Sequence, residues 1–181
     1  ERLIPFDLIP RIIGAGEWAN LVRGIEQRVK AINAFLHDIY HRQEIIRAGR
    51  VPERLIREND AFLPRMIGMD PPGGIYTHIV GVDLVRTGPN EFFVLEDNAR
   101  TPSGVSYMLE NRETMLRMFP ELFSRVAVRE VSNYPKLLRR SLAACAPPGC
   151  SGSPVVAVLT PGIHNSAYFE HAFLADQMGV E

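Results

Sequence analysis

The chain has 181 residues, of which 20 are Lys or Arg and 21 are Asp or Glu, so its formal net charge is −1 at pH 7. A chain of this length can bury a full hydrophobic core, as one large domain or as two small lobes. Without a basic field, nucleic acid is not expected as a partner, and without a long apolar run no membrane span is expected. The start lacks a charged and apolar leader, which favours a soluble cytoplasmic protein.

A long amphipathic helix is predicted near the start of the chain. The periodicity of its apolar residues indicates one long or kinked helix over 17–48, with Gly49 as its stop. A short helix is expected at 52–58, and a Pro/Gly-rich loop at 68–74 follows it. The apolar residues that recur at three and four are Trp18, Leu21, Val22, Ile25, Val29, Ile32, Leu36 and Ile39.

The segment 79–98, IVGVDLVRTGPNEFFVLEDN, is predicted to form a β-hairpin. If Pro89 and Asn90 are the two central turn residues, the strand partners pair by a fixed sum, and Asp83 lies opposite Glu96. Because strand side chains alternate, Asn98 shares the face of Glu96. The opposite face is expected to hold Val82, Leu84, Phe93 and Leu95.

Two carboxylates and an amide on one face are typical of a divalent-metal site. Opposed like charges destabilise an antiparallel pair by a few tenths to about 1 kcal/mol, unless a cation lies between them. Mg²⁺ prefers such hard oxygen ligands together with phosphate oxygens and water. The alternative is an ordinary solvated hairpin end whose Asn98 only closes a turn, or a four-residue loop that shifts the register.

The run that follows the hairpin, NARTPSG, contains groups suited to a phosphate. Ser103 is predicted to be the N-cap of a helix that begins near Gly104, where unpaired N–H groups and the helix dipole favour an anion. Arg100 is expected to continue the Glu96 and Asn98 face, where it could contact a phosphate or carboxylate in a bidentate manner. A metal pair, an arginine and a helix N-terminus are the parts that phosphoryl transfer uses.

These residues resemble the metal-binding strand pair of the ATP-grasp ligases, in which an Asp is followed by a Glu and then by x-Asn. Two longer runs, EDNARTPSGVSYMLENR and LTPGIHNSAYFEHAFLADQMGVE, resemble the circularly permuted ATP-grasp family, a bacterial group related in sequence to glutathionylspermidine synthetase. The opening FDLIPRII, with EW at 17–18 and FLHDIY at 35–40, fits the same family.

The resemblance implies an ATP-grasp-like fold and an ATP- and Mg²⁺-dependent ligase. Such an enzyme activates a carboxylate as an acyl phosphate for attack by an amine or thiol, here on an amino-acid or small peptide-like substrate. It implies Asp83, Glu96 and Asn98 as metal ligands. Related ligases carry an arginine two residues before the first metal Asp, where this chain has Gly81, so Arg100 is the candidate catalytic replacement.

The nucleotide-binding part of the permuted family follows later in its sequences, and nothing in this chain resembles it. The chain is therefore expected to be a fragment that holds the metal half of an active site and is inactive alone, with most of the ATP site outside it. Nothing in the sequence indicates an oligomeric state.

The remaining elements lie towards the end of the chain. Helices are predicted at 104–118, ended by Pro120, and at 132–145. The Pro- and Gly-containing segment 145–154 is the expected linker between a helix-rich metal-binding part, 1–145, and the start of a second unit, 154–181.

That second unit is expected to be a strand at 154–159, a glycine loop and a helix from Asn165 to Met178. The loop lacks the full three-glycine fingerprint, which favours a plain turn with Asn165 as N-cap. If the loop does bind a ligand, the family resemblance implies a substrate rather than a dinucleotide and makes Asn165 a candidate contact. Together the elements predict an α/β (α+β) fold, in which helices surround a mixed or antiparallel sheet containing the hairpin.

Two alternatives to a ligase remain open. One is a non-catalytic ATP-grasp-like scaffold or binding module, in which the cation only supports the structure. The other, weaker one is a zinc hydrolase, because His37 and His41 lie at i, i+4 on a predicted helix with Asp38 beside the first. A zincin needs Glu as the acid and a third ligand, and the sequence marks neither nearby.

Overall fold

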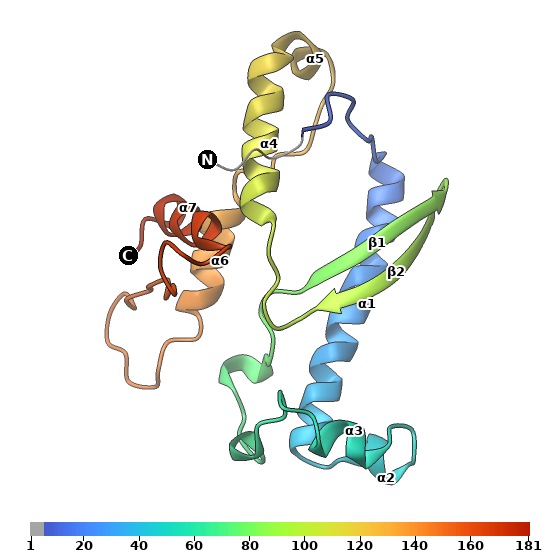
Figure 1. Cartoon of the computed structure of the whole chain (residues 1–181), viewed down its shortest axis with the longest axis vertical. Coiled ribbons are helices and arrows are strands. Elements are labelled where there is room, and N and C mark those ends of the chain that lie inside the picture. The colour runs from blue at the N-terminus through green and yellow to red at the C-terminus, as the bar shows by residue number, and fades with distance from the viewer. Residues whose placement is uncertain (1–5) are drawn as a thin grey trace. The chain divides into compact units, whose positions relative to one another are not determined.

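The computed structural model describes residues 6–181. They form two compact units, one of residues 11–102 and one of residues 6–10 with 103–181 (Figure 1). The predicted division into 1–145 and 154–181 is a different one and stays a prediction, and its first five residues lie outside the described part. The mixed helical and hairpin architecture confirms the predicted fold class.

A long helix and a two-stranded antiparallel hairpin dominate the unit of residues 11–102 (Figure 1). The hairpin runs alongside the helix, and the short helices follow the end of the long one. The elements are α1 (Ala15–Tyr40), α2 (Glu44–Arg47), α3 (Glu53–Arg57), the 3₁₀ turns η1 (Pro64–Met66) and η2 (Pro72–Gly74), and the strands β1 (Gly81–Gly88) and β2 (Glu91–Asn98).

The predicted helix at 17–48 is interrupted, and Asp38 explains the break. Its carboxylate accepts hydrogen bonds from the backbone N–H groups of Glu44 (2.8 Å) and Ile45 (2.9 Å), the first residues of α2. Gln43, which precedes α2, takes a left-handed conformation with φ 57°. Gly49 adopts φ 67° just after α2, which is the stop that the sequence predicted.

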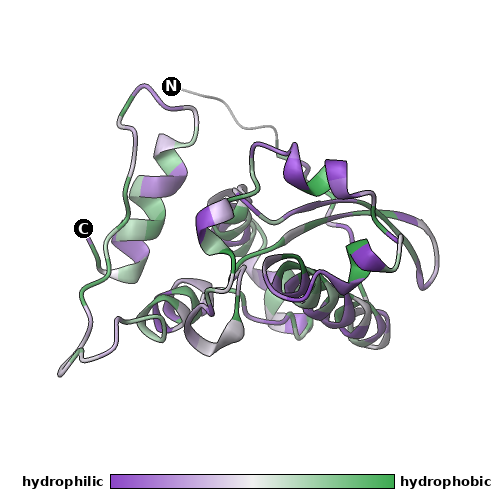
Figure 2. Ribbon diagram, turned by 90° about the horizontal axis from the view of Figure 1, so that it is seen from below, coloured by the Kyte–Doolittle hydropathy of each residue, from purple (hydrophilic) through white to green (hydrophobic). Residues whose placement is uncertain are grey.

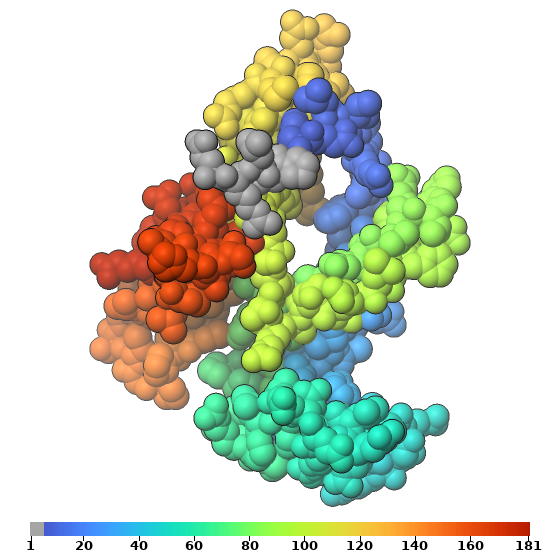
Figure 3. Space-filling view, viewed as in Figure 1, coloured from blue at the N-terminus to red at the C-terminus, as the bar shows by residue number. Residues whose placement is uncertain are grey.

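The segment that follows α1 folds back on the end of that helix. Tyr40 is buried, and its ring stacks on Phe62 with centroids 5.1 Å apart. The Tyr40 hydroxyl accepts a hydrogen bond from the backbone N–H of Leu63. The Tyr40 backbone carbonyl accepts another from the backbone N–H of Gly68. These contacts draw the segment into one compact mass, coloured cyan to teal in Figure 3.

The hairpin confirms the predicted register at both of its ends. Gly88 pairs with Glu91 across the Pro89-Asn90 turn, and Asp83 pairs with Glu96. Between these pairs β2 has one extra residue, Leu95, and β1 has one extra residue, Thr87. The two bulges compensate for each other, so the fixed pairing sum holds at the tip and at the Asp83–Glu96 pair but not between them.

The bulges correct one prediction about the hairpin faces. Phe92 and Val94, together with Leu84, line a groove against α1. Phe93 and Leu95, which were predicted to share the Leu84 face, are instead 56% and 69% exposed. A bulge shifts the alternation by one residue, which reverses the direction of the side chains beyond it. Figure 2 shows hydrophobic (green) segments along the hairpin strands.

The other unit is helical. Its helices confirm the predicted ones at 104–118, 132–145 and near the end of the chain. The first of these ends just before Pro120, as predicted, and Pro120 begins a further short helix. Its buried apolar side chains are Leu109, Met115, Leu138 and Met178. The helices are α4 (Val105–Met118), α5 (Pro120–Arg125), α6 (Tyr134–Ala143) and α7 (Tyr168–Met178).

The strand predicted at 154–159 is not formed. Val155 and Leu159 are each 97% exposed, and the segment makes a single backbone hydrogen bond to the chain end, from Val158 N to the Glu181 carbonyl (2.7 Å). A strand needs a partner, and no described segment offers this one a ladder. Among the helices of residues 6–181, none has the length and apolar character needed to cross a bilayer.

Candidate functional site

Asp83 and Glu96 face each other across the hairpin, on the side directed away from α1. Their backbones are register partners, and both side chains are exposed. The Asn98 amide lies on the same face and donates from Nδ2 to Glu96 Oε1 at 3.2 Å. This bond fixes the Glu96 carboxylate and leaves the Asn98 oxygen as an acceptor, so three oxygen-bearing side chains share one face.

The carboxylate pair fits a hard divalent cation. Within the described residues, Asp83 and Glu96 have no ion pair with a basic side chain that would relieve their mutual repulsion. Facing carboxylates without such a partner favour a bound cation, and Mg²⁺ binds through one or two carboxylates plus water and phosphate oxygens. Asp83, Glu96 and Asn98 are the residues that would hold it.

The neighbouring Asp97 is directed to the other side of β2 from Glu96 and Asn98, and it has a different role. It points to α1, where Arg28 Nε lies 2.7 Å and 2.8 Å from its two oxygens and Nη2 lies 2.7 Å from Oδ2. The hydrogen bond with Asp97 raises the pKa of Arg28 above its usual value. Asp97 is therefore a neutralised structural residue, although it lies between two candidate ligands in the sequence.

The hairpin tip is held to α1 by a second acidic residue. Glu17, whose side chain is only 9% exposed, pairs with Arg86 at 2.9 Å and accepts a hydrogen bond from the backbone N–H of Asn90 at 3.0 Å. Together with the Arg28–Asp97 pair, this contact fixes both ends of the hairpin on one helix. The carboxylate face is thereby held outward.

Gly81 lies where related ligases are expected to carry an arginine, and Arg100 is the candidate replacement for that arginine. A Cβ at Gly81 would lie 3.2 Å from Pro102 Cβ and 3.5 Å from Asn98 Cβ, so this hairpin leaves little room for a side chain there. Arg100 is exposed just after β2, and its guanidinium makes no hydrogen bond or ion pair with another residue of the described part. It is available to a ligand.

The N-terminus of α4 differs from its prediction. Gly104, with φ 103°, is the N-cap in place of Ser103, which makes no capping bond. The buried carboxylate of Glu170 on α7 accepts hydrogen bonds from the Gly104 N–H and the Ser106 hydroxyl, both at 2.7 Å. An internal anion therefore already lies where Ser103 and Gly104 were predicted to bind phosphate, which agrees with the attraction of helix N-termini for negative charge.

Asn165 lies just before α7. Its Oδ1 accepts a hydrogen bond from the backbone N–H of Ala167 at 2.9 Å, which forms a turn that leads into the helix. The N-cap of α7 is Ala167, so Asn165 is not the N-cap that the sequence left open but a residue of the turn that precedes the helix. A substrate contact by Asn165 stays a prediction.

A comparison with known protein families bears on the chemistry of this hairpin face. The family model described as circularly permuted ATP-grasp type 2 matches residues 10–181. The chain belongs to this circularly permuted ATP-grasp family. The resemblance found in the motifs is thus confirmed at the level of the family.

Curated relatives of this ATP-grasp chain are longer proteins. An uncharacterised protein of Synechocystis is 52% identical over 181 residues, which is 100% of this chain and 37% of the relative. An uncharacterised protein of Mycobacterium tuberculosis is 52% identical, over 100% of this chain and 33% of its own length. A Frankia alni protein, provisionally named a glutamate–cysteine ligase, is 46% identical over 99% of this chain and 21% of its own length.

The chain therefore spans about a third of the first of these ATP-grasp relatives. The family and the provisional ligase name of the Frankia protein agree with ATP-dependent ligase chemistry at a coarse level.

Sequence reasoning missed two residues that complete side-chain clusters. Glu170 completes the cluster at the start of α4, and Asp70 approaches His37 and His41. Both lie on segments distant in sequence from their partners, and no local motif marks them. Asp38, the acid beside His37, is occupied in capping α2, and the Ile45 and Glu44 N–H groups hold its pKa below the usual range. It is thus unsuited to act as the base of a zinc hydrolase.

Proposed function

We propose that the whole protein containing this chain is an ATP- and Mg²⁺-dependent ligase that joins a carboxylic acid to an amine or thiol through an acyl phosphate. The observation that carries this proposal is the pairing of Asp83 with Glu96, with Asn98 bonded to Glu96 on the same outward face. A Mg²⁺ ion held there would neutralise charge on the phosphates of ATP.

Arg100 is the residue that we assign to the transferring phosphoryl group or the substrate carboxylate. Its guanidinium is exposed and free of described partners, and an arginine fork matches either anion. Ser103 and Gly104 are weaker phosphate candidates, because Glu170 already accepts from the Gly104 N–H. Asn165 stays a candidate substrate contact.

For the substrate we propose an amino acid or a small peptide-like acid, with a cytoplasmic location where ATP is supplied. The provisional glutamate–cysteine ligase names of two Frankia relatives support this class. The likeness to glutathionylspermidine synthetase points the same way, since both names describe amide formation on a small amino-acid-derived acid. We further propose that most of the adenine site lies outside residues 1–181.

The decisive experiment compares Glu96→Gln with Asp97→Asn in the whole protein, with ADP release measured across a panel of amino-acid acids and amines. Glu96→Gln should lower turnover by two to three decades, because it removes a preorganised charge contact worth about 3 kcal/mol in the transition state. Asp97→Asn, one residue away but paired with Arg28, should retain most of the turnover.

Three further variants refine the assignment. Asn98→Ala should resemble Glu96→Gln, and Arg100→Ala should do so if Arg100 contacts the reacting phosphoryl group. The scaffold alternative predicts no ATP turnover by the wild-type protein with any acid and amine. Unchanged turnover in Glu96→Gln would contradict the metal assignment.

A further inference from the structure

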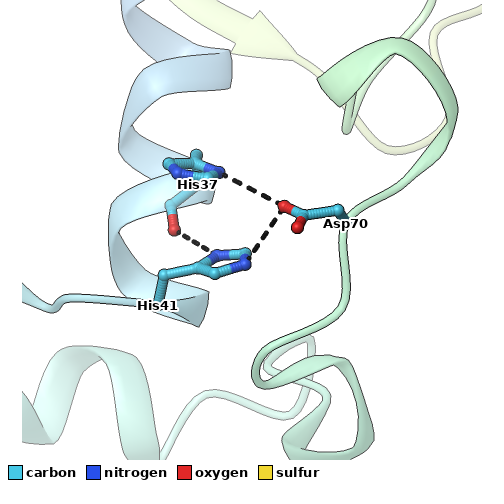
Figure 4. Close-up of side chains that lie close together, drawn as sticks. All are labelled: His37, His41 and Asp70. Carbon is cyan, nitrogen blue, oxygen red and sulfur yellow. Dashed lines mark hydrogen bonds and ion pairs between the residues drawn. The ribbon is translucent and has the colours of Figure 1, made fainter.

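Three side chains that could bind a metal meet at the end of α1. Figure 4 shows His37 on the last turn of α1, His41 just after the end of this helix, and Asp70 reaching towards both from the loop that precedes η2. His41 Nε2 lies 3.2 Å from Asp70 Oδ1, and His37 Nδ1 lies 4.0 Å from the same oxygen. The two imidazole rings are stacked, with centroids 4.3 Å apart.

The hydrogen bond on the other side of the His41 ring fixes which nitrogen can bind a metal. His41 Nδ1 lies 2.9 Å from the carbonyl oxygen of His37, and a carbonyl can only accept, so Nδ1 carries the proton. In the neutral ring Nε2 then has a free lone pair. Metal-bound histidines commonly donate their second N–H to a backbone carbonyl in this way, which orients the ring.

His41 Nε2 is buried and has no hydrogen-bond partner in the described part of the chain, although Asp70 Oδ1 is only 3.2 Å away. The oxygen must therefore lie off the axis along which this nitrogen would donate a hydrogen. Two ligands of one tetrahedral metal ion share this off-axis arrangement, and with bonds of about 2.0 Å they lie about 3.3 Å apart. The separation of His41 Nε2 and Asp70 Oδ1 matches that spacing, whereas His37 Nδ1, 4.0 Å from the same oxygen, has to move closer to join them on one ion.

Tyr76 lies beside the cluster and gives it a polar wall. Its hydroxyl is 3.4 Å from His37 Nδ1, His41 Nδ1 and the Met69 carbonyl. A neutral phenol is suited to hydrogen-bond a metal-bound water and is not itself a ligand.

We propose that His37, His41 and Asp70 form a binding site for Zn²⁺ or a similar borderline divalent transition metal, with a fourth position open to water. Two imidazoles and one carboxylate suit such an ion, whereas the all-oxygen set of Asp83, Glu96 and Asn98 suits Mg²⁺. The site joins the end of α1 to the loop that contains Asp70. It is independent of the proposed ligase function.

The test is a calorimetric titration of the metal-free protein with Zn²⁺, in the presence of excess Mg²⁺ to occupy oxygen sites. The wild-type protein should show a Zn²⁺-binding event that His41→Ala and Asp70→Asn each weaken by at least about tenfold. His164→Ala and Asp60→Asn, which replace exposed residues outside the cluster, are the matched controls and should bind Zn²⁺ as the wild type does. Co²⁺ should give the visible absorption of a four-coordinate site, and the same two variants should abolish it.

His37→Ala guards against a folding artefact, because His37 is exposed and its loss removes a ligand without opening the interior. It should weaken Zn²⁺ binding as well. The proposal is overturned if the wild-type protein binds no Zn²⁺ under these conditions. It is also overturned if the His37, His41 and Asp70 variants bind Zn²⁺ as tightly as the two controls.

Discussion

Asp38 illustrates how one side chain can decide where a helix ends. One long or kinked helix was predicted over 17–48, yet α1 stops at Tyr40 and α2 begins at Glu44. The Asp38 carboxylate reaches forward to accept the N–H groups of Glu44 and Ile45, which would otherwise lack partners at the start of α2. The break also gives the chain its turn away from α1.

We predict that Asp38→Asn destabilises the unit of residues 11–102 by about 1 kcal/mol at neutral pH. Each carboxylate oxygen of Asp38 accepts one backbone N–H, whereas an amide has a single oxygen acceptor and no charge. The pKa of Asp38 is lowered in the folded state, so its contribution is complete above the ordinary value of 3.8 and is lost as the pH falls through the folded pKa. The difference between wild type and variant should therefore shrink below about pH 4.

Urea unfolding at pH 7 and pH 3 measures this difference. The fluorescence of Trp18, the single tryptophan of the chain, reports this unit, because it lies on α1. A difference in urea midpoint that is the same at both pH values would show that the charge of Asp38 contributes nothing to the cap.

At the scale of elements, the pairing at both ends of the hairpin was predictable from the sequence, and the bulges between them were not. The turn residues Pro89 and Asn90 determine the pairing at the tip, and the pairing sum correctly places Asp83 opposite Glu96. The bulges at Thr87 and Leu95 have no sequence signature as clear as the turn, and they reverse the predicted directions of Phe93 and Leu95. Local chemistry was predictable, whereas this irregularity was not.

Asn33 connects α1 to the segment that leads into the hairpin. Its Oδ1 accepts hydrogen bonds from the backbone N–H groups of Tyr76 (2.8 Å) and Thr77 (3.2 Å). Thr77 is buried, and its hydroxyl lies within hydrogen-bond distance of the carbonyls of Ile79, just before β1, and Ala99, just after β2. The base of the hairpin is thus held to the helix by one amide side chain.

We predict that Asn33→Ala destabilises this unit by about 2 kcal/mol, because it leaves two part-buried N–H groups without acceptors. Asn20→Ala, an exposed asparagine on the same helix, is the control and should change the stability by less than about 0.5 kcal/mol. Urea midpoints followed by Trp18 fluorescence compare the two. Equal effects of Asn33→Ala and Asn20→Ala would show that the hydrogen bonds from Tyr76 and Thr77 to Asn33 do not contribute to stability.

At the scale of the whole molecule, the contacts that the sequence could not predict are those between distant segments. Glu170 reaches the start of α4 from a helix more than sixty positions away, and Asp70 reaches His41 from a separate loop. Helix N-termini and histidine pairs are visible in a sequence, but the side chain that completes them depends on tertiary packing. The strand predicted at 154–159 failed for the same reason, since a strand depends on a partner that its own residues do not specify.

The central claim is that Asp83, Glu96 and Asn98 hold one divalent cation. Mn²⁺, a spectroscopic substitute for Mg²⁺, can be followed by water-proton relaxation in the whole protein with ATP present, in a His41→Ala background that removes the proposed transition-metal site. We predict that Glu96→Gln weakens Mn²⁺ binding at least about tenfold while Asp97→Asn, its Arg28-paired neighbour, leaves it unchanged. Equal Mn²⁺ binding by the wild type and Glu96→Gln, or equal weakening by both variants, would contradict the account.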